Sequence, residues 1–230
     1  MIGIIGAMEE EVALLKEAMT VEETVEYASM IFCRGNLYGK EAVLVRSGIG
    51  KVNAGICAQI LVDKFQVDVL INTGIAGSLD ADIDIGDMVI STELVEHDMD
   101  ASIFGDSVGQ IPRMDTFSFP ADEALVEKAK AANMEANPDI RTFTGRIVSG
   151  DQFVSSAEVK EKLVNTFHAR CTEMEGAAIA HAAYLNKVSC VIIRAISDKA
   201  DNSATMDYPV FEKKAIEHSV RLIQNLLPRI

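Results

Sequence analysis

The sequence predicts an α/β fold, in which a largely parallel or mixed sheet carries helices on both faces. Short apolar runs that end in glycine alternate with longer amphipathic segments through most of the 230 residues. Short apolar runs are typical of buried strands, and amphipathic segments are typical of helices with one face on the core. The alternation of the two is typical of α/β domains. No repeat, low-complexity tract or linker interrupts the pattern, so we expect residues 1–230 to form a single domain.

The predicted elements follow from local patterns along the chain. The first strand is Ile2–Gly6, an apolar run that ends in glycine, and a helix from about Glu9 to Met19 follows it. Further strands are expected at 30–37, 41–47, 67–72, 87–95, 141–148 and 188–196, and further helices at 51–65, 121–133, 156–167, 175–186 and 209–227. The stretch 97–120 has little periodicity, so we predict a long functional loop there.

The helix expected over residues 51–65 has the clearest helical pattern. Val52, Ile56 and Ile60 recur every four residues, flanked by Cys57, Leu61 and Phe65. Such a stripe predicts an amphipathic helix, whose apolar side ordinarily faces the core.

The net charge of −14 excludes whole classes of partner. A nucleic-acid-binding protein needs basic residues to neutralise phosphates, and this chain has no cluster of Lys or Arg. An anionic membrane surface is disfavoured for the same reason. The acidity itself indicates a well-solvated surface. We therefore expect neither nucleic acid nor a membrane as a partner.

The start of the chain and the cysteines indicate a cytoplasmic protein. The apolar N-terminal run is short, lacks a basic region and continues into three glutamates, which argues against a signal peptide. No segment reaches the ~18 uninterrupted apolar residues that a membrane helix needs. Cys33, Cys57, Cys171 and Cys190 lie in or beside apolar runs without a CxxC pair, as buried free thiols do. The four histidines show no metal-ligand spacing, so no metal site is predicted.

Two glycine-rich segments follow predicted strands. Residues 47–51 (SGIGK) connect a strand to a helix, where backbone N–H groups could cradle a phosphate. The segment matches neither the GxxxxGK[ST] phosphate loop nor the GxGxxG dinucleotide loop, and a tight turn explains it equally well. Residues 72–78 (NTGIAGS) are expected to close the preceding strand and are open to the same two interpretations.

Three consecutive glutamates begin the first predicted helix. Favourable interaction with the helix macrodipole is sufficient to explain Glu9 and Glu10. Glu11 becomes a catalytic candidate only through its position near a strand end, where open α/β sheets place their active sites.

Two further strand ends carry acids. Glu173 and Glu175 lie where a strand gives way to a helix; on extended backbone they would share a face, with Met174 opposite. A carboxylate there can accept hydrogen bonds from a vicinal diol, and helix capping is the alternative. Asp198 follows the apolar strand 188–196, and Ser197 beside it could orient its carboxyl group. This pattern fits two roles for Asp198 equally well: a residue of an active site, or a residue that only stabilises a helix cap or a turn.

Six segments together carry a family resemblance. They are IGIIGAMEEEV, SGIGKVNA, NTGIAGS, SGDQF, EMEGAAIAH and RAISDKAD, in this order and spacing. Along essentially its whole length the chain resembles bacterial 5′-methylthioadenosine/S-adenosylhomocysteine nucleosidases. EMEGAAIAH and RAISD are shared more widely across the purine nucleoside phosphorylase-like superfamily, whereas GAMEEEV is the more specific segment.

The resemblance implies a nucleoside phosphorylase-like fold, a three-layer α/β/α sandwich with a mixed central sheet, assembled as a homodimer. It implies irreversible hydrolysis of 5′-methylthioadenosine, S-adenosylhomocysteine and 5′-deoxyadenosine to adenine and the 5′-modified ribose. These reactions belong to methionine salvage and methyl-cycle recycling. The expected ligand is therefore a small nucleoside, and no metal or organic cofactor is expected.

The resemblance also assigns site residues. The general base falls on Glu11 and the acid that protonates the purine on Asp198, which Ser197 holds. Glu175 falls on the position that binds the ribose diol, with Met174 beside the sugar. The remaining matched positions are Phe153 stacked on adenine, Val154 reading the adenine edge through its backbone, Met8, Ile49 and Tyr208 near the ribose and the 5′ group, Ile75 at a contact position, and the loop residues Phe104 and Pro112 reaching the partner subunit's site.

Three matched positions depart from the residues that are frequent in the family. Ile75 stands where serine is frequent, which removes a polar contact. Tyr208 stands where phenylalanine is frequent, which adds a hydroxyl near the 5′ group and can alter substrate preference. Val154 stands where isoleucine is frequent, a change without consequence for a backbone contact.

These residue types suit the cleavage of an N-glycosidic bond. The reaction leaves positive charge on the ribose and negative charge on the purine, and two carboxyl groups can act as acid and base. Asp198 would be protonated and donate toward the purine, whereas Glu11 would be ionised and take a proton from water. Glu9 and Glu10 beside Glu11 would repel phosphate, so hydrolysis is expected rather than phosphorolysis.

Three other functions compete with the nucleosidase. They are a purine nucleoside phosphorylase, a futalosine-type nucleoside hydrolase and a non-enzymatic nucleoside-binding domain. The presence of Glu11, Glu175 and Asp198 together argues against the third.

Overall fold

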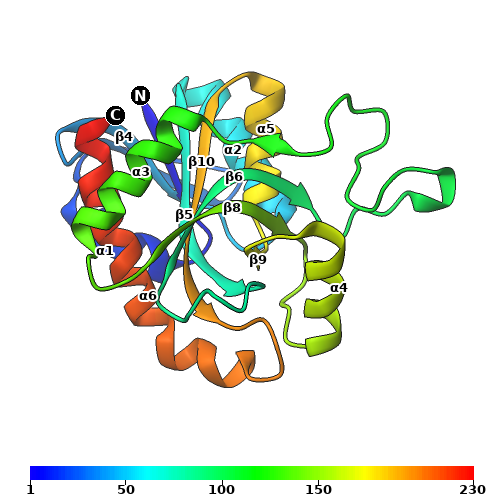
Figure 1. Ribbon diagram of the computed structural model, residues 1–230. Helices are drawn as coiled ribbons and strands as arrows, with labels where there is room; N and C mark the ends of the chain where they lie inside the picture. Colours follow the sequence, from blue (N-terminus) through cyan, green and yellow to red (C-terminus); the bar gives the residue numbers. More distant parts are fainter.

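The computed structural model describes all 230 residues and contains one mixed sheet surrounded by helices (Figure 1). The strands are β1 (Ile2–Gly6), β2 (Thr20–Tyr27), β3 (Met30–Leu37), β4 (Lys40–Arg46), β5 (Val69–Ser78), β6 (Met88–Glu96), β7 (Phe119–Pro120), β8 (Thr142–Ser149), β9 (Cys171–Glu173) and β10 (Ser189–Asp198). The helices are α1 (Glu9–Ala18), α2 (Lys51–Phe65), α3 (Glu123–Ala136), α4 (Ala157–Phe167), α5 (Gly176–Asn186) and α6 (Ala204–Leu226), with short 3-10 turns η1 (Ser102–Phe104) and η2 (Leu227–Arg229).

The sheet brings four strand ends to one edge. Its order is β10-β6-β8-β9-β5-β1-β4-β3-β2, with β7 on β6 and an additional pairing of β10 with β5. β1 runs parallel to β4 and β5, and β10 runs parallel to β5, whereas β2–β3, β3–β4 and β6–β10 are antiparallel. The carboxyl ends of β1, β4, β5 and β10 therefore emerge together, which is where open α/β sheets hold their ligands.

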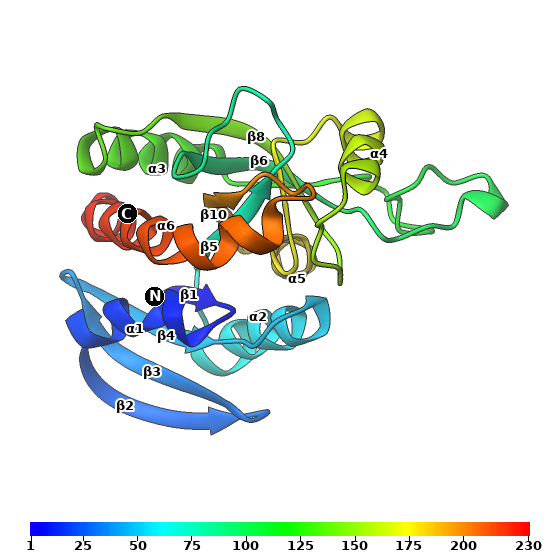
Figure 2. The same ribbon diagram turned by 90° about the horizontal axis from the view of Figure 1, so that it is seen from below.

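Helices cover both faces of the sheet (Figures 1 and 2). Apolar side chains of α1, α3 and α6 join one core cluster, and those of α2 and α5 join a second cluster on the other face. All five residues of β1 are buried, as expected for a strand covered on both sides. The α/β fold with a mixed central sheet and flanking helices is thus confirmed.

Most predicted elements are confirmed within three residues, and three are not. β5 continues to Ser78, so the interpretation of residues 72–78 as a loop is wrong; that segment pairs with β10 and β9. β2 was not predicted, because its largely exposed residues show no alternation of apolar and polar side chains. α6 begins at Ala204, five residues before the predicted start at Pro209, and includes that proline.

The apolar stripe of α2 faces outward. The helix itself is confirmed at Lys51–Phe65, but Val52 is 71% exposed and Ile56 43% exposed. The buried residues of the helix are Ala54, Cys57, Ala58, Leu61 and Phe65. α2 packs against the alanine-rich helix α5, and small side chains allow the two helices to approach closely. The stripe is therefore an exposed apolar surface.

The predicted long loop forms an arm. Residues 97–120 include η1 and β7 and are otherwise irregular, and the arm projects from the body of the molecule (Figures 1 and 2). Its tip residues Ile103 and Phe104 are 88% and 87% exposed. Elsewhere, all four cysteines are free and buried, as the sequence predicts. None of the helices combines the length and the apolar character that crossing a membrane requires.

Candidate active site

A cavity of about 250 Å³ lies at the edge where β1, β4, β5 and β10 end. Eleven of the thirteen predicted site residues line it: Met8, Glu11, Ile49, Ile75, Phe153, Val154, Met174, Glu175, Ser197, Asp198 and Tyr208. Six more residues complete the lining: Ala7, Ala76, Gly77, Gln152, Thr172 and Glu173. No Lys, Arg or His is among them, so the cavity wall holds acids, small polar groups and apolar side chains.

Glu11 lies in the first turn of α1, with its carboxylate folded back over the end of β1. Its Oε2 accepts hydrogen bonds from the N–H groups of Ala7, at 2.6 Å, and Met8, at 3.0 Å. Its Oε1 accepts from the N–H of Ile75 at 3.2 Å. The bond to Met8 is the usual link from the third helical residue to the helix start, so Glu11 caps α1 as well as facing the cavity.

The groups around Glu11 shift its pKa in opposite directions. Burial raises the pKa of Glu11 above its ordinary value, although the positive charge of Arg194 and the three N–H donors act in the opposite direction. Each carboxylate oxygen accepts at least one N–H, which favours the ionised form over the protonated one. Gly74 leaves the space for this carboxylate, since a Cβ at that position would overlap Oε1. The aliphatic side chain of Ile75 does not affect the hydrogen bond, because the backbone makes it.

Asp198 lies at the end of β10 and is 2% exposed. Its Oδ1 accepts from the N–H of Ala200 at 2.8 Å, and the Ser197 hydroxyl donates to its Oδ2 at 2.8 Å. Burial raises the pKa of Asp198, against the lowering effect of these two bonds. Gly77 on β5 makes room for the carboxyl group, because a Cβ there would lie 2.7 Å from Oδ1. A buried carboxyl group with a raised pKa is suited to carry a proton.

Glu175 connects α5 to the glycine segment 47–51. Its Oε1 accepts the N–H of Gly50 at 2.8 Å, and Gly50 has a φ of +96° that favours glycine. This bond uses the N–H that the phosphate interpretation would need, so the structure supports the tight-turn interpretation. Burial, the charge of Glu173 and the charge of Glu11 raise the pKa of Glu175 to about 7, while Arg194 and the Gly50 N–H lower it.

The expected alternation at residues 173–175 is wrong. Glu173, Met174 and Glu175 all line the cavity, although extended backbone would place Met174 on the opposite face. The chain changes from β9 to α5 at this point, and Glu175 is the residue that caps the helix. The two acids also have different partners: Glu173 accepts the N–H of Gly176, and Glu175 accepts the N–H of Gly50.

A buried polar network forms the floor behind the cavity. The guanidinium of Arg194 forms an ion pair with Glu173 and also donates to Asn72. Glu173 further accepts the Ser149 hydroxyl and the N–H of Gly176, the latter at 2.8 Å. Burial alone would lower the pKa of Arg194, but Glu173, Glu11 and Glu175 raise it above its usual value. One buried cation thus neutralises part of the charge of three carboxylates.

Arg194 is a functional residue that pattern reasoning missed. It lies inside the apolar strand predicted at 188–196, and its side chain is 2% exposed. A charge in such a strand needs a buried partner of opposite sign, and this requirement is the signal that could have identified it. Glu173, two residues before the assigned ribose ligand, is that partner.

Aromatic side chains form the outer wall. The rings of Phe153 and Tyr208 meet edge to face, with centroids 5.8 Å apart, and Phe153 is 46% exposed. The Tyr208 hydroxyl lies 3.4 Å from the sulfur of Met8, so the aromatic pair continues into the thioether side chain of α1's N-cap residue. An exposed aromatic ring beside a cavity can stack on a flat ligand.

The chain matches known proteins over its full length. The family model described as the phosphorylase superfamily covers residues 1–228. The 5′-methylthioadenosine/S-adenosylhomocysteine nucleosidases of Staphylococcus aureus and Staphylococcus saprophyticus are 41% and 42% identical, over 100% of both chains in each case. The chain belongs to this nucleosidase family.

Solved structures of the nucleosidase family agree with the fold. The nucleosidase of Neisseria meningitidis in complex with methylthio-immucillin-A is 38% identical, with a TM-score of 0.95 over 100% of this chain and 99% of that one. The Colwellia psychrerythraea enzyme in complex with adenine is 40% identical, with a TM-score of 0.95 over 99% and 94%. Futalosine hydrolase of Helicobacter pylori is 35% identical, with a TM-score of 0.94 over 100% and 97%.

Phe104 and Pro112 are the two predicted site residues outside the cavity. Both are exposed on the arm, and Phe104 is 87% exposed. At this exposure the ring of Phe104 does not pack within its own subunit, and its predicted contact with a partner subunit stays a prediction.

Proposed function

We propose that the protein hydrolyses the N-glycosidic bond of 5′-methylthioadenosine, S-adenosylhomocysteine and 5′-deoxyadenosine, releasing adenine and the 5′-modified ribose. The observation that carries this proposal is the pairing of two buried carboxyl groups, Glu11 and Asp198, in one cavity of a nucleosidase-family chain. The reaction would serve methionine salvage and recycling of the methyl cycle's product.

Asp198 acts as the acid in the proposed mechanism. Burial raises the pKa of Asp198, which favours the protonated carboxyl group, and Ser197 fixes the direction of that group. As the glycosidic bond lengthens, the proton moves toward the purine and adenine leaves as a neutral molecule. Phe153 would stack on the purine ring and hold it in line with Asp198.

Glu11 acts as the base. It accepts three backbone N–H bonds, which hold its carboxylate in one orientation. From there it would take a proton from a water molecule that attacks the ribose, and its negative charge would stabilise the cationic sugar. Acid and base thus work on opposite charges of one transition state.

Glu175 would bind the ribose hydroxyls. The Gly50 N–H occupies one face of Oε1, and the cavity-facing lone pairs are available to hydroxyl donors. Binding both hydroxyls fixes the sugar relative to Glu11 and Asp198, and such positioning can account for several kcal/mol of the barrier. Met174 beside Glu175 would pack on the sugar.

The charge of the cavity favours water over phosphate as the nucleophile. Glu9 and Glu10 are exposed and screened by solvent, so they contribute little to the repulsion of phosphate. The buried carboxylates Glu11, Glu173 and Glu175 outweigh the single cation Arg194, and no basic residue lines the cavity. An anionic nucleophile would meet net repulsion there.

Adenine release in phosphate-free buffer tests the proposal. The wild-type protein is incubated with 5′-methylthioadenosine, and free adenine is followed with and without added phosphate. Hydrolysis predicts equal rates in both buffers. A rate that depends on phosphate would assign the protein as a phosphorylase, and turnover only of a futalosine-type nucleoside would assign the other hydrolase.

We also propose a homodimer in which the arm completes the partner's site. Its support is the exposed arm tip, with Ile103 and Phe104, and the exposed apolar stripe of α2, with Val52 and Ile56. Apolar surface of this kind is buried in stable subunit interfaces. The four free cysteines fit a reducing compartment, so we propose that the dimer works in the cytoplasm.

A further inference from the structure

Tyr208 connects the cavity wall to a carboxylate that the proposed mechanism does not use. Its ring lines the cavity against Phe153, and its hydroxyl donates to Oε1 of Glu212 at 2.9 Å. Glu212 lies one turn further along α6 and is partly exposed. It forms no ion pair with Lys or Arg, so its charge is not neutralised by the protein.

A second cavity continues from this corner. It measures about 510 Å³ and shares Ala7, Met8 and Ile49 with the active-site cavity. Met8, whose sulfur contacts the Tyr208 hydroxyl, and Ile49 also form the side of the active site assigned to the 5′ group. A 5′ substituent longer than methyl would leave the apolar lining past these two side chains.

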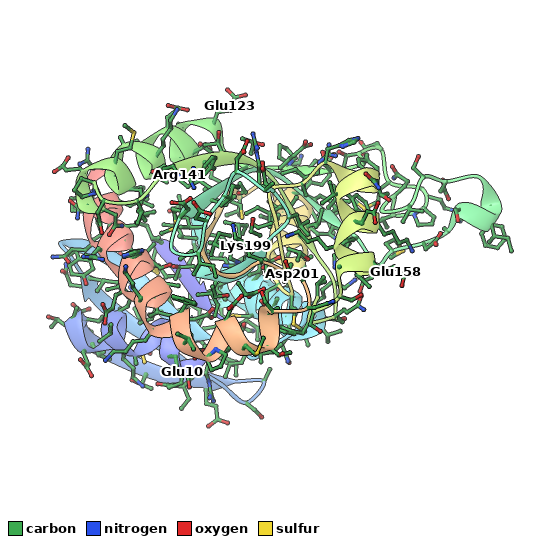
Figure 3. All side chains as sticks on the ribbon, turned by 60° about the horizontal axis from the view of Figure 1, so that its bottom comes forward. Glu10, Glu123, Arg141, Glu158, Lys199 and Asp201 are labelled. Atoms are coloured by element: carbon green, nitrogen blue, oxygen red, sulfur yellow. The ribbon has the colours of Figure 1, made fainter.

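The charges around this exit are mostly negative. Glu9 and Glu10 line the second cavity together with one cation, Arg46, whose Nε lies 3.8 Å from Glu9 with both side chains about half exposed. Glu10 has no ion-pair partner and lies beside the first turns of α6 (Figure 3). Burial, the bond to Glu212 and the charges of Glu11 and Glu10 raise the pKa of Tyr208.

We propose that Glu212, held in place by Tyr208, selects 5′-thioether nucleosides whose substituent ends in an ammonium group. The inference rests on the proposed hydrolysis and extends it to a substrate class, the 5′-(aminoalkylthio)-5′-deoxyadenosines. The Tyr208 hydroxyl touches both the Met8 sulfur and the Glu212 carboxylate, so a terminal ammonium leaving past Met8 comes within reach of this unneutralised carboxylate, with Glu10 nearby. A terminal carboxylate in the same place meets like charge. The amino group of S-adenosylhomocysteine would use the same contact.

Three nucleosides of similar length test the inference. They carry a propylthio, a 3-aminopropylthio or a 2-carboxyethylthio group at the 5′ position, and the readout is kcat/KM for adenine release at low salt. Each charged substrate is normalised to the propylthio substrate of the same protein. We expect the amine to exceed the carboxylate by about tenfold in the wild type, mainly through KM, since each partly exposed charge pair contributes only a few-fold.

Variants locate the effect. Glu212→Gln should lower the amine-to-carboxylate ratio about threefold to fivefold, and Tyr208→Phe should lower it less, because the carboxylate remains but loses its fixed position. Glu217→Gln removes the same charge from an exposed position of α6 that makes no hydrogen bond to Tyr208, and it should keep the wild-type ratio.

The outcomes separate the inference from the proposed function. If propylthio turnover is normal but the amine-to-carboxylate ratio is near one, or is unchanged in Glu212→Gln, the selection by Glu212 is wrong while hydrolysis stands. Wild-type protein that releases no adenine from any of the three nucleosides would overturn both. Salt of 0.5 M should compress the wild-type ratio toward one, as expected for exposed charges.

Discussion

The floor and the rim of the active-site cavity are built in opposite ways. At the floor, Arg194 and Glu173 are almost fully buried and bonded to each other and to neighbouring polar groups. At the rim, Ile49 is 53% exposed and Phe153 is 46% exposed. The only aromatic ring that packs on Phe153 is that of Tyr208. Floor groups have one arrangement, whereas rim groups can adjust to what enters.

This difference separates chemistry from substrate choice. The groups that must hold a proton or a charge are fixed by backbone N–H bonds and buried ion pairs, which keep their orientation before the substrate arrives. The groups that we propose to contact the 5′ substituent and the partner subunit lie on the half-exposed side. Substitutions at the floor should therefore cost catalysis or stability, and those at the rim should shift affinity.

The largest effect is expected from replacing either catalytic carboxyl group by an amide, which removes the negative charge of Glu11 or the transferable proton of Asp198. Glu11→Gln and Asp198→Asn should each lower kcat by roughly 10²–10⁴-fold, the range for loss of a positioned acid or base. Nucleoside binding should remain, because shape is conserved. Single-turnover adenine release and calorimetric binding measure the two properties. Glu17→Gln, an exposed position on α1, is the control. Near-normal turnover in either variant would refute that residue's role.

The buried ion pair of the floor should dominate stability. Arg194→Met leaves Glu173 as an uncompensated buried charge, which ordinarily costs about 3–5 kcal/mol of unfolding free energy. Arg34→Met breaks the Arg34–Glu41 pair, whose side chains are 39% and 53% exposed, and should lower the unfolding free energy far less, because solvent screens this pair. Urea denaturation of both variants measures the contrast. Equal losses of unfolding free energy in the two variants would contradict the prediction that the buried Arg194–Glu173 pair matters more for stability than the exposed Arg34–Glu41 pair.

Glu175→Gln should stabilise the protein in a pH-dependent way. Glu175 has a pKa of about 7 in the fold against an ordinary value of 4.5, so the fold disfavours its ionised form. Its stability contribution is therefore full below about pH 4.5 and is lost as the pH rises to 7. At pH 8 the Gln variant should gain up to ~3 kcal/mol, and at pH 4 nearly nothing.

Thermal or urea unfolding across this pH range tests the sign. Activity should fall in the same variant, because the ribose hydroxyls lose a charged acceptor. A gain in unfolding free energy at pH 4 as large as that at pH 8, or a loss at pH 8, would contradict the prediction that the fold disfavours the ionised form of Glu175. Stability gained at the expense of activity is the expected signature of a group retained for function.

Local sequence signals made three cavity acids candidates, whereas the family resemblance assigned their roles and most of the other cavity residues. Glu11, Glu175 and Asp198 follow strand ends, and a single linear pattern places each near the same edge of a parallel sheet. Arg194 was missed because periodicity describes its strand as apolar throughout, and only pairing with Glu173 explains the charge.

The sequence pattern also did not show which face of α2 is buried or that β2 is a strand. α2 has apolar residues on two sides, and the pattern favoured Val52 and Ile56, although the side with Ala54 and Ala58 meets α5. The choice depends on close helix–helix contact, which spacing alone does not encode. β2 lies at the edge of the sheet with mostly exposed residues, so burial left no alternation to detect.

A smaller effect is expected at the rim, where the arm is proposed to meet the partner subunit. Phe104→Ser at the arm tip removes a large exposed ring, and a central aromatic contact in an interface typically contributes about 2 kcal/mol. The dimer dissociation constant should therefore rise roughly thirtyfold by sedimentation, and adenine release should fall at nanomolar protein but recover at micromolar protein. Met134→Ser, which changes an exposed apolar side chain on α3, should alter neither property. An unchanged dissociation constant with Phe104→Ser would place the arm outside the interface and leave the 5′ side of the cavity to residues of one chain alone.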